Sequence, residues 1–168
     1  ARTKSPGYPG TQAGAREEGD MHTLRGKGHA LRREYARAIT CFEMALSILG
    51  PNHRASRDYT SALNGLADAE RHSGNLQRAD ELYHEALSIA KQIDSINDIA
   101  AYTGNLAALA IDRKDFALAE SLARQALELA RKVGRQESIA ADYRRLCEAL
   151  AGQGRLNEAR ENAVRAEE

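Results

Sequence analysis

The side chains best suited to acid–base, nucleophilic or metal chemistry are few and scattered in this chain of 168 residues. Asp68 and His72 lie four residues apart, a spacing that brings two side chains together on one face of a helix. Such a pair is usually a surface contact worth about a few tenths of a kcal/mol, not an acid–base couple. The histidines form no HExxH pattern and no cluster with cysteine at metal-ligand spacing; they are His22, His29, His53, His72 and His84. The sequence therefore predicts no enzymatic activity, no metal and no cofactor.

A repeated apolar pattern organises most of the chain. Between residues 60 and 91, two apolar segments at helical spacing are separated by the turn sequence His72-Ser73-Gly74-Asn75. The small residue Ala79 in the second segment recurs every 40 or 41 residues, at Ala38, Ala119 and Ala159. A fixed period of this length is typical of stacked helical repeats. We therefore expect an all-α fold of about four antiparallel helix pairs.

The repeat pattern divides the chain into a leader and one domain. Residues 1–18 are rich in Gly, Pro, Ser, Thr and Arg without apolar periodicity, so we expect a flexible leader. Residues 19–168 form the expected domain, with repeats at about 19–52, 57–93, 97–134 and 138–168. The sequence stops at Glu168 inside a predicted helix without a polar capping helix, so we expect the natural protein to continue.

The first predicted helix of the domain has the weakest pattern. It contains two glycines, Gly26 and Gly28, each of which costs about 1 kcal/mol relative to alanine inside a helix. Arg25 stands where later repeats have an apolar residue, namely Leu66, Leu106 and Leu146. A register shifted by two residues would instead place Leu24 and Leu31 in the core.

Composition and charge argue against several functional classes. The 24 basic and 24 acidic side chains cancel, so no overall field attracts the chain to nucleic acid. No apolar run approaches the roughly 18 residues of a membrane span, and no signal peptide is apparent. Cys41 and Cys147 lie in different repeats of a stack, too far apart for a disulfide. A cytoplasmic location with reduced cysteines is expected.

The residues aligned by this period resemble the signature of the tetratricopeptide repeat. The matching columns are Leu66/Leu106/Leu146, Ala67/Ala107/Cys147, Leu76/Phe116/Leu156, Ala79/Ala119/Ala159, Tyr83/Ala123/Ala163 and Ala86/Ala126/Ala166. Arg33 and Lys114 depart from it, because they replace the turn glycine found at Gly74 and Gly154. The long period, and the segments 49–53 and 63–67, resemble the kinesin light chain subclass. This resemblance implies a right-handed superhelical solenoid that binds proteins or peptides and catalyses nothing.

In this family the first helix of each pair lines a concave groove, which implies a peptide-binding site here. The positions expected to line it are Asn64, Asp68, Arg71, Gly104, Asn105, Ala108, Asp112, Arg144, Arg145 and Glu148. Asparagine can bond a peptide backbone through both its donor and its acceptor, and arginine can bind a carboxylate with two parallel bonds. Gly65, Gly104 and nearby alanines are expected to keep the wall low, leaving room for an inserted helix or strand. Only Asn105 and Arg145 match the dicarboxylate clamp of this family, which argues against a chaperone tail as the ligand.

The expected function is a protein–protein interaction scaffold that binds a peptide or helix of a partner in its concave groove. One alternative is a sensor or regulatory arm of a larger NTPase or transcription regulator. Another is a self-assembly module, in which Leu156, Ala159 and Ala163 on the last helix pair with another copy. Neither nucleic acid nor a membrane is expected as a partner.

Overall fold

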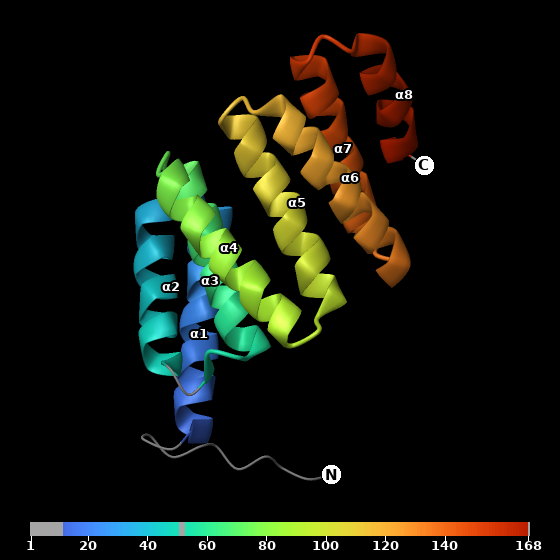
Figure 1. The fold of residues 1–168 in the computed structure, drawn as a ribbon. Helices are drawn as coiled ribbons and strands as arrows, with labels where there is room; N and C mark the ends of the chain where they lie inside the picture. Colours follow the sequence, from blue (N-terminus) through green and yellow to red (C-terminus); the bar gives the residue numbers. More distant parts are fainter. Residues whose placement is uncertain (1–11, 51–52, 168) are drawn as a thin grey trace.

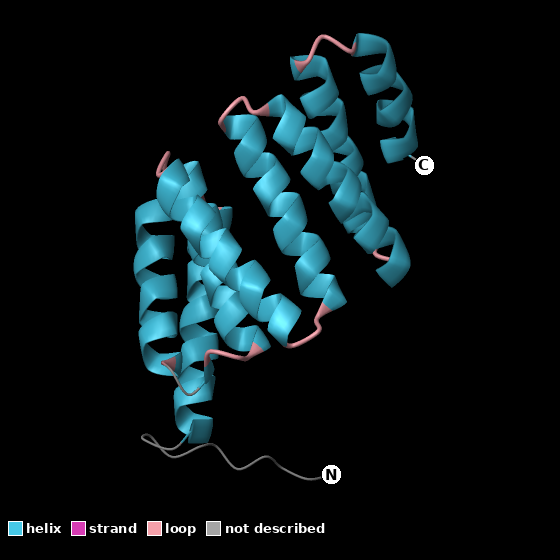
Figure 2. Ribbon diagram, viewed as in Figure 1, coloured by secondary structure: helices cyan, strands magenta, loops and turns pink. Residues whose placement is uncertain are grey.

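The structure is a computed structural model that describes residues 12–50 and 53–167. The described residues form eight helices and no strand (Figure 2). In chain order the helices are α1 (Gln12–Leu31), α2 (Tyr35–Leu49), α3 (Arg57–His72), α4 (Leu76–Gln92), α5 (Ile96–Asp112), α6 (Phe116–Val133), α7 (Gln136–Gly152) and α8 (Leu156–Glu167). The predicted all-α fold of about four helix pairs is therefore confirmed.

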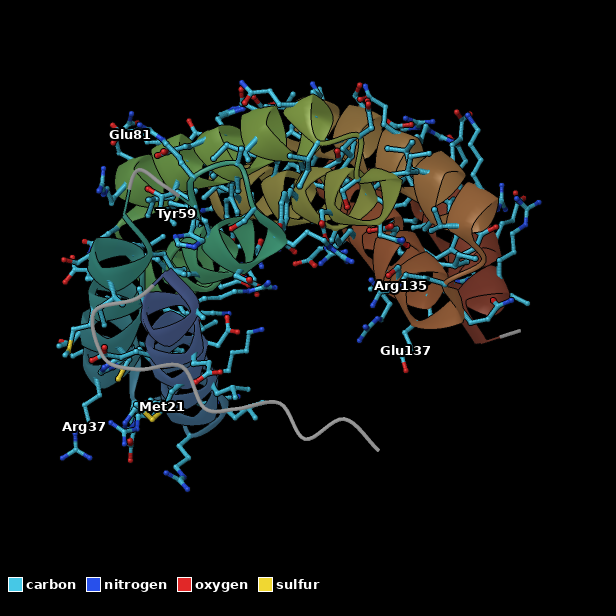
Figure 3. All side chains as sticks on the ribbon, turned by 90° about the horizontal axis from the view of Figure 1, so that it is seen from below. Met21, Arg37, Tyr59, Glu81, Arg135 and Glu137 are labelled. Carbon is cyan, nitrogen blue, oxygen red and sulfur yellow. The ribbon has the colours of Figure 1, made fainter. Side chains whose placement is uncertain are left out.

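The helix pairs stack side by side from α1/α2 at one end to α7/α8 at the other (Figure 1). Seen from below in the view of Figure 3, the molecule is an arch, with α1, α3, α5 and α7 on its hollow side. We call these four the inner helices. The helices α1 and α8 lie at opposite ends of the arch, and each pair packs mainly against its neighbours in sequence.

Small residues sit where the paired helices cross, as the repeat pattern predicts. The side chains of Ala38, Ala79 and Ala119 are fully buried, and Ala159 is only 9% exposed. A methyl group at these positions lets the two backbones approach closely, while larger neighbours such as Leu63 and Leu150 fill the space between crossings. The core therefore consists of one large cluster from α2 to α5 and two smaller clusters between α5 and α8, and the half-buried Leu122 packs against all three.

The four turns within the pairs share one hydrogen-bond pattern. The backbone N–H of the residue after each turn donates to a carbonyl five residues earlier: Glu34 to His29, Asn75 to Glu70, Asp115 to Ala110 and Arg155 to Leu150. This bond requires a left-handed residue between the helices. Gly74 and Gly154 supply it with φ of 89° and 77°, and Arg33 and Lys114 adopt it with φ of 60° and 61°. Arg33 and Lys114 therefore replace glycine without changing the conformation of the turn.

The helix α1 begins earlier than the sequence indicates. It starts at Gln12, so residues 12–18 are helical and do not belong to the flexible leader predicted for 1–18; the remainder of that leader lies outside the described residues. Contacts with later elements favour this extension. Arg16 pairs with Asp58 of α3 at 2.6 Å, and Gly19 packs against Leu49 of α2.

The register of α1 also differs from both alternatives drawn from the sequence. The shifted register is wrong, because Leu24 is 68% exposed and Leu31 is 88% exposed. Arg25 is exposed as well, and Gly26 takes the core position instead. The ring of Phe42 fills that position, since a Cβ atom added to Gly26 would lie 2.7 Å from it.

Candidate functional site

A groove of about 1110 Å³ runs along the hollow side of the arch. It is lined by the inner helices, with Lys27 from α1, Asn64 and Asp68 from α3, Asn105 from α5 and Arg145 from α7. Because successive inner helices are one repeat apart in sequence, residues spaced by about 40 positions meet across the groove floor. We call this feature the concave groove.

The structure brings together half of the residues expected to line the groove. Asn64, Asp68, Arg71, Asn105 and Arg145 line it. Gly104 is buried against α7, and Ala108 is half-buried outside the lining. Asp112 contacts Arg71 from beyond the groove edge. Arg144 and Glu148 instead line a separate hollow of about 580 Å³ between α7 and α8.

Six charged residues of the groove are not found by counting from the repeated alanines, and most of them lie near the start of the inner helices. They are Arg16, Lys27, Arg57, Asp58, Asp98 and Arg135. The sequence does contain a signal for four of them, namely opposite charges spaced by about one repeat. Arg16 precedes Asp58 by 42 residues, and Arg57 precedes Asp98 by 41 residues. Arg135, which precedes α7, was missed because it lies outside any predicted helix.

A chain of hydrogen bonds crosses three inner helices along the groove floor. Asn105 Nδ2 donates to Asn64 Oδ1 at 2.8 Å, and Arg145 Nη2 donates to Asn105 Oδ1 at 3.2 Å. At one end Arg145 Nη1 pairs with Asp142 Oδ1 at 2.6 Å. At the other end Asn64 Nδ2 lies 3.5 Å from Asp68 Oδ2. We call Asp68, Asn64, Asn105, Arg145 and Asp142 the polar ladder.

The polar ladder is anchored below the groove by buried groups. The Tyr83 hydroxyl donates to Asp68 Oδ1 at 2.5 Å, and burial together with the Asp68 charge raises the pKa of Tyr83 well above its usual value. Asp142 is 2% exposed, and burial raises its pKa although the Arg145 guanidinium acts in the opposite direction. Each asparagine of the ladder has a second amide hydrogen that these contacts leave unused.

Most of the groove arginines are already paired with carboxylates. Arg16 pairs with Asp58 at 2.6 Å, Arg57 with Asp98 at 3.2 Å and Arg71 with Asp112 at 2.7 Å, each across one repeat. Two cations differ from them. Lys27 donates to the Ser61 hydroxyl at 3.0 Å, and neither Lys27 nor Arg135 has a carboxylate within ion-pair distance in the described part of the chain.

Arg71 of the groove has a buried donor without a partner among the described residues. Its Nη2 donates to Nε2 of His72 at 3.0 Å, while its buried Nε has no hydrogen-bond partner among the described residues. Burial and the adjacent Arg71 charge lower the pKa of His72, so its ring is neutral at neutral pH and accepts that bond. The His72 ring in turn stacks on Tyr35 with centroids 5.2 Å apart.

The helical glycines do not keep the groove wall low, contrary to the expectation from the sequence. A Cβ atom on Gly65 would lie 2.5 Å from the Phe42 ring, and one on Gly104 would lie 2.7 Å from Asp142 Oδ1. Gly152 holds the ring of Phe116 in the same way, at 2.5 Å. These glycines therefore accommodate side chains of the chain itself, since only a hydrogen atom fits at such close approach.

Metal-binding clusters and membrane-spanning helices are both absent from the described residues. No three His, Cys, Asp or Glu side chains among them are grouped as a metal site would require. None of the helices combines the length and apolar character needed to cross a lipid bilayer, within the part of the chain that the structure describes.

Comparisons with known proteins identify the repeats. Residues 58–132 match the family model of the tetratricopeptide repeat. No curated protein sequence matches the chain. Among solved structures, BtubC (BKLC) from P. vanneervenii is similar, with a TM-score of 0.79 and 19% identity over 89% of this chain and 61% of that one. The chain thus spans about three fifths of the length of BtubC.

A second group of similar structures has the same architecture. A protein of Podospora anserina assigned as a kinesin light chain, with nearly identical TPR-like repeats, has a TM-score of 0.67 and 19% identity. The alignment covers 95% of this chain and 75% of that one, and a point variant of the same protein has a TM-score of 0.69. At this identity the likeness shows the fold alone. Residues 58–132 therefore belong to the tetratricopeptide repeat family, and the helix pairs on either side continue the tetratricopeptide-like solenoid seen in these kinesin-light-chain-like structures.

Proposed function

We propose that this chain is a protein-interaction module that binds an extended peptide segment of a partner in the concave groove. Tetratricopeptide repeats in general mediate protein–protein interaction, which supports this class of function. The observation that carries the proposal is the polar ladder on the floor of a groove of about 1110 Å³. The ladder is a row of side chains across three helices whose hydrogen-bond donors and acceptors are only partly occupied by one another.

The spacing of the polar ladder suits an extended backbone. Neighbouring packed helices lie about 8–10 Å apart, and an extended chain rises about 3.3 Å per residue. Asn64, Asn105 and Arg145 come from consecutive inner helices, so a peptide crossing them would meet one ladder residue at about every third position. The ladder bonds to one another hold these side chains in place before a ligand arrives, which reduces the entropy lost on binding.

The charges of the groove favour an acidic peptide. Arg16, Arg57 and Arg71 are neutralised by carboxylates of the chain, whereas Lys27 and Arg135 are not. A ligand carboxylate near either of these two would complete an ion pair without displacing an existing one. The proposed site therefore comprises Lys27, Asn64, Asp68, Arg71, Asn105, Arg135 and Arg145.

The proposal can be tested with short random-sequence peptides selected for binding to the full 168-residue chain. Selected peptides are labelled, and their affinity is measured by fluorescence anisotropy. Lys27→Glu with Arg135→Glu reverses the two groove cations that lack carboxylate partners. Lys91→Glu with Lys132→Glu makes the same charge change on α4 and α6, outside the groove lining. We expect the groove variant to bind an acidic selected peptide at least about tenfold more weakly, and the control variant to bind it as the unmodified chain does.

A third variant tests the polar ladder independently of charge steering. Asn105→Ala removes the middle residue, which contacts both Asn64 and Arg145. We expect weaker binding of every selected peptide, whether acidic or not, because the contacts of an amide are made to the peptide backbone. Equal affinity of all three variants for the selected peptides would overturn the assignment of the concave groove as the binding site.

A further inference from the structure

An apolar stripe on α1 faces away from the rest of the described chain. It consists of Met21, Leu24 and Leu31, which are 44%, 68% and 88% exposed, and of Gly28, where an added Cβ atom would meet nothing within 4 Å. No other large apolar residue of the described chain is as exposed as Leu31. The stripe lies opposite the buried face of α1, where Gly19 and Gly26 pack against α2. Figure 3 shows Met21 at the edge of the arch, away from α3 and α4.

The spacing of this α1 stripe is that of a helix-pairing seam. Residues 21, 24, 28 and 31 follow each other at intervals of three, four and three, as the seam positions of a coiled coil do. The residues of the opposite face, in contrast, contact α2 and α3 within the chain. The helix α1 therefore has two faces built for packing, and the structure fills one of them.

The charges beside the α1 stripe indicate which occupant fits it. The first half of α1 is acidic at Glu18 and Asp20, and the second half is basic at Arg25 and Lys27. A second copy of α1 running antiparallel would place each acidic half against the basic half of the other copy. Glu18 and Arg25 are exposed, and neither forms an ion pair within the described part of the chain.

One antiparallel register pairs Met21 with Leu24 at the centre of the stripe and matches the charges, with Leu31 of each copy beside Gly14 of the other. If Met21 of one copy lies beside Leu24 of the other, the same alignment places Glu18 beside Arg25 and Asp20 near Lys27, each contact occurring twice by symmetry. A parallel pair would bring Lys27 near Arg32, which are like charges. The antiparallel register therefore has the better charge complementarity.

We propose that α1 is a self-association surface through which two copies of this chain pair, with their α1 helices antiparallel and Met21 of each beside Leu24 of the other. A single pair of 20-residue helices is about 30 Å long and buries an area at the low end for protein interfaces. The pairing is therefore a reversible equilibrium between monomer and dimer. Two of its residues, Lys27 and Leu31, also line the concave groove, so the pairing is measured in the absence of peptide.

Sedimentation equilibrium over a wide range of concentration tests the pairing. The mass of the chain is expected to rise from 18.4 kDa toward twice that value. Leu24→Glu with Leu31→Glu places two charges in the stripe and is expected to keep the chain monomeric throughout. The control, Leu118→Glu with Leu156→Glu, alters leucines on α6 and α8 that are 48% and 64% exposed and is expected to associate like the unmodified chain. A chain that stays monomeric overturns the proposal. Association that is lost in the control and kept in the α1 variant also overturns it, and would place the contact at α6 or α8.

Charge reversal tests the antiparallel register. Glu18→Arg alone and Arg25→Glu alone each create a like-charge contact at two symmetric places, so each is expected to weaken the dimer about tenfold or more. The double variant restores opposite charges and is expected to recover the dimer. All of these side chains are exposed, so circular dichroism of the variants is expected to match that of the unmodified chain. Failure of the double variant to recover the dimer would overturn this register.

Discussion

Phe42 is the residue on which the first three helices converge. Its ring, 1% exposed, lies against two glycines of flanking helices, Gly26 in α1 and Gly65 in α3. Glycine inside a helix costs about 0.5–1 kcal/mol relative to alanine. The close approach that it permits allows the ring to fill the space between both backbones. The two glycines therefore serve core packing, and Gly28, which faces open space, does not.

This difference between glycines predicts opposite effects of the same substitution. Gly65→Ala places a Cβ 2.5 Å from the Phe42 ring and is expected to lower the free energy of unfolding by about 1–3 kcal/mol. Gly28→Ala adds a better helix former where nothing lies within 4 Å and is expected to raise it by up to about 1 kcal/mol. Urea denaturation of both variants measures these changes. Equal effects of the two substitutions would contradict the role assigned to Gly65.

Tyr83 links the buried core to the polar ladder, and its titration predicts the behaviour of the chain at alkaline pH. Burial and the Asp68 charge raise the pKa of Tyr83 above 10, so the folded chain retains the phenol proton at pH values where the unfolded chain loses it. Stability contributed by this group is complete below pH 10 and is lost as pH rises further, because the unfolded chain then binds fewer protons. Burial also raises the pKa of Tyr102, to about 12, with the same sign.

Tyr83→Phe separates the stability contributed by the hydrogen bond to Asp68 from the pH dependence caused by the raised pKa of Tyr83. At pH 7 the variant is expected to be less stable by about 1.5–3 kcal/mol, because Asp68 loses the hydroxyl that donates to it at 2.5 Å. Between pH 9 and 11 its stability is expected to fall less steeply than that of the unmodified chain. The measurement is the free energy of unfolding across this pH range, with Tyr102→Phe as the comparison. Parallel curves for the Tyr83 variant and the unmodified chain would contradict the raised pKa.

At the scale of elements, the turns within the helix pairs depend on backbone conformation more than on residue type. All four use the same bond from the residue after the turn to a carbonyl five residues earlier. Two of them place a residue with a side chain in the left-handed region, Arg33 and Lys114. That conformation costs a residue other than glycine roughly 1–2 kcal/mol. The hydrogen bonds and packing of the flanking helices hold these residues there.

Lys114→Gly is therefore expected to stabilise the chain by about 1 kcal/mol, since φ of 61° is unstrained for glycine. Gly74→Ala makes the reverse change at φ of 89° and is expected to destabilise it by a similar amount. Both positions lie at turns where the added or removed atoms meet little, so packing changes do not obscure the comparison. Thermal unfolding monitored by circular dichroism is the measurement. A destabilised Lys114→Gly variant would refute this account of the turns.

At the scale of the whole molecule, contacts between repeats are mainly nearest-neighbour ones. Each helix pair packs on the next, and the polar ladder joins α3, α5 and α7 in a single network. In such stacks the stability is approximately a sum of terms for each repeat and for each interface between neighbours. A substitution at one interface is therefore expected to destabilise mainly the two helix pairs that form that interface.

Asn105→Ala removes the residue that joins the ladder across two interfaces. We expect faster amide hydrogen exchange in α3, α5 and α7 and little change in α1 and α2, because the latter do not contact the ladder. Asn162→Ala, whose side chain bonds only a carbonyl of its own helix, is the matched control and is expected to leave exchange in α3 and α5 unchanged. Uniform acceleration over all helices in the first variant would show that the chain unfolds as one unit.

Local spacing in the sequence determined the class of fold, the helix pairs, the crossing alanines and the positions of the turns. These features depend on residues within one repeat and recur, so each copy reinforces the same interpretation. Ala79 with its equivalents and Gly74 with Gly154 were identifiable for this reason. The donors Asn64, Asn105 and Arg145 were also placed correctly on inner helices, because they occupy fixed positions relative to the crossing alanines.

Only the tertiary structure decided how the repeats meet. The first helix starts at Gln12 and buries Gly26 because of contacts with Phe42 and Leu49, which its own apolar pattern does not contain. The space beside Gly65 and Gly104 is filled by side chains from neighbouring helices, and Arg57 and Arg71 are neutralised by carboxylates one repeat away. The physical reason is common to all of these. Periodicity reports which face of a helix is apolar, whereas the curvature of the stack sets which polar residues of successive repeats come within bonding distance.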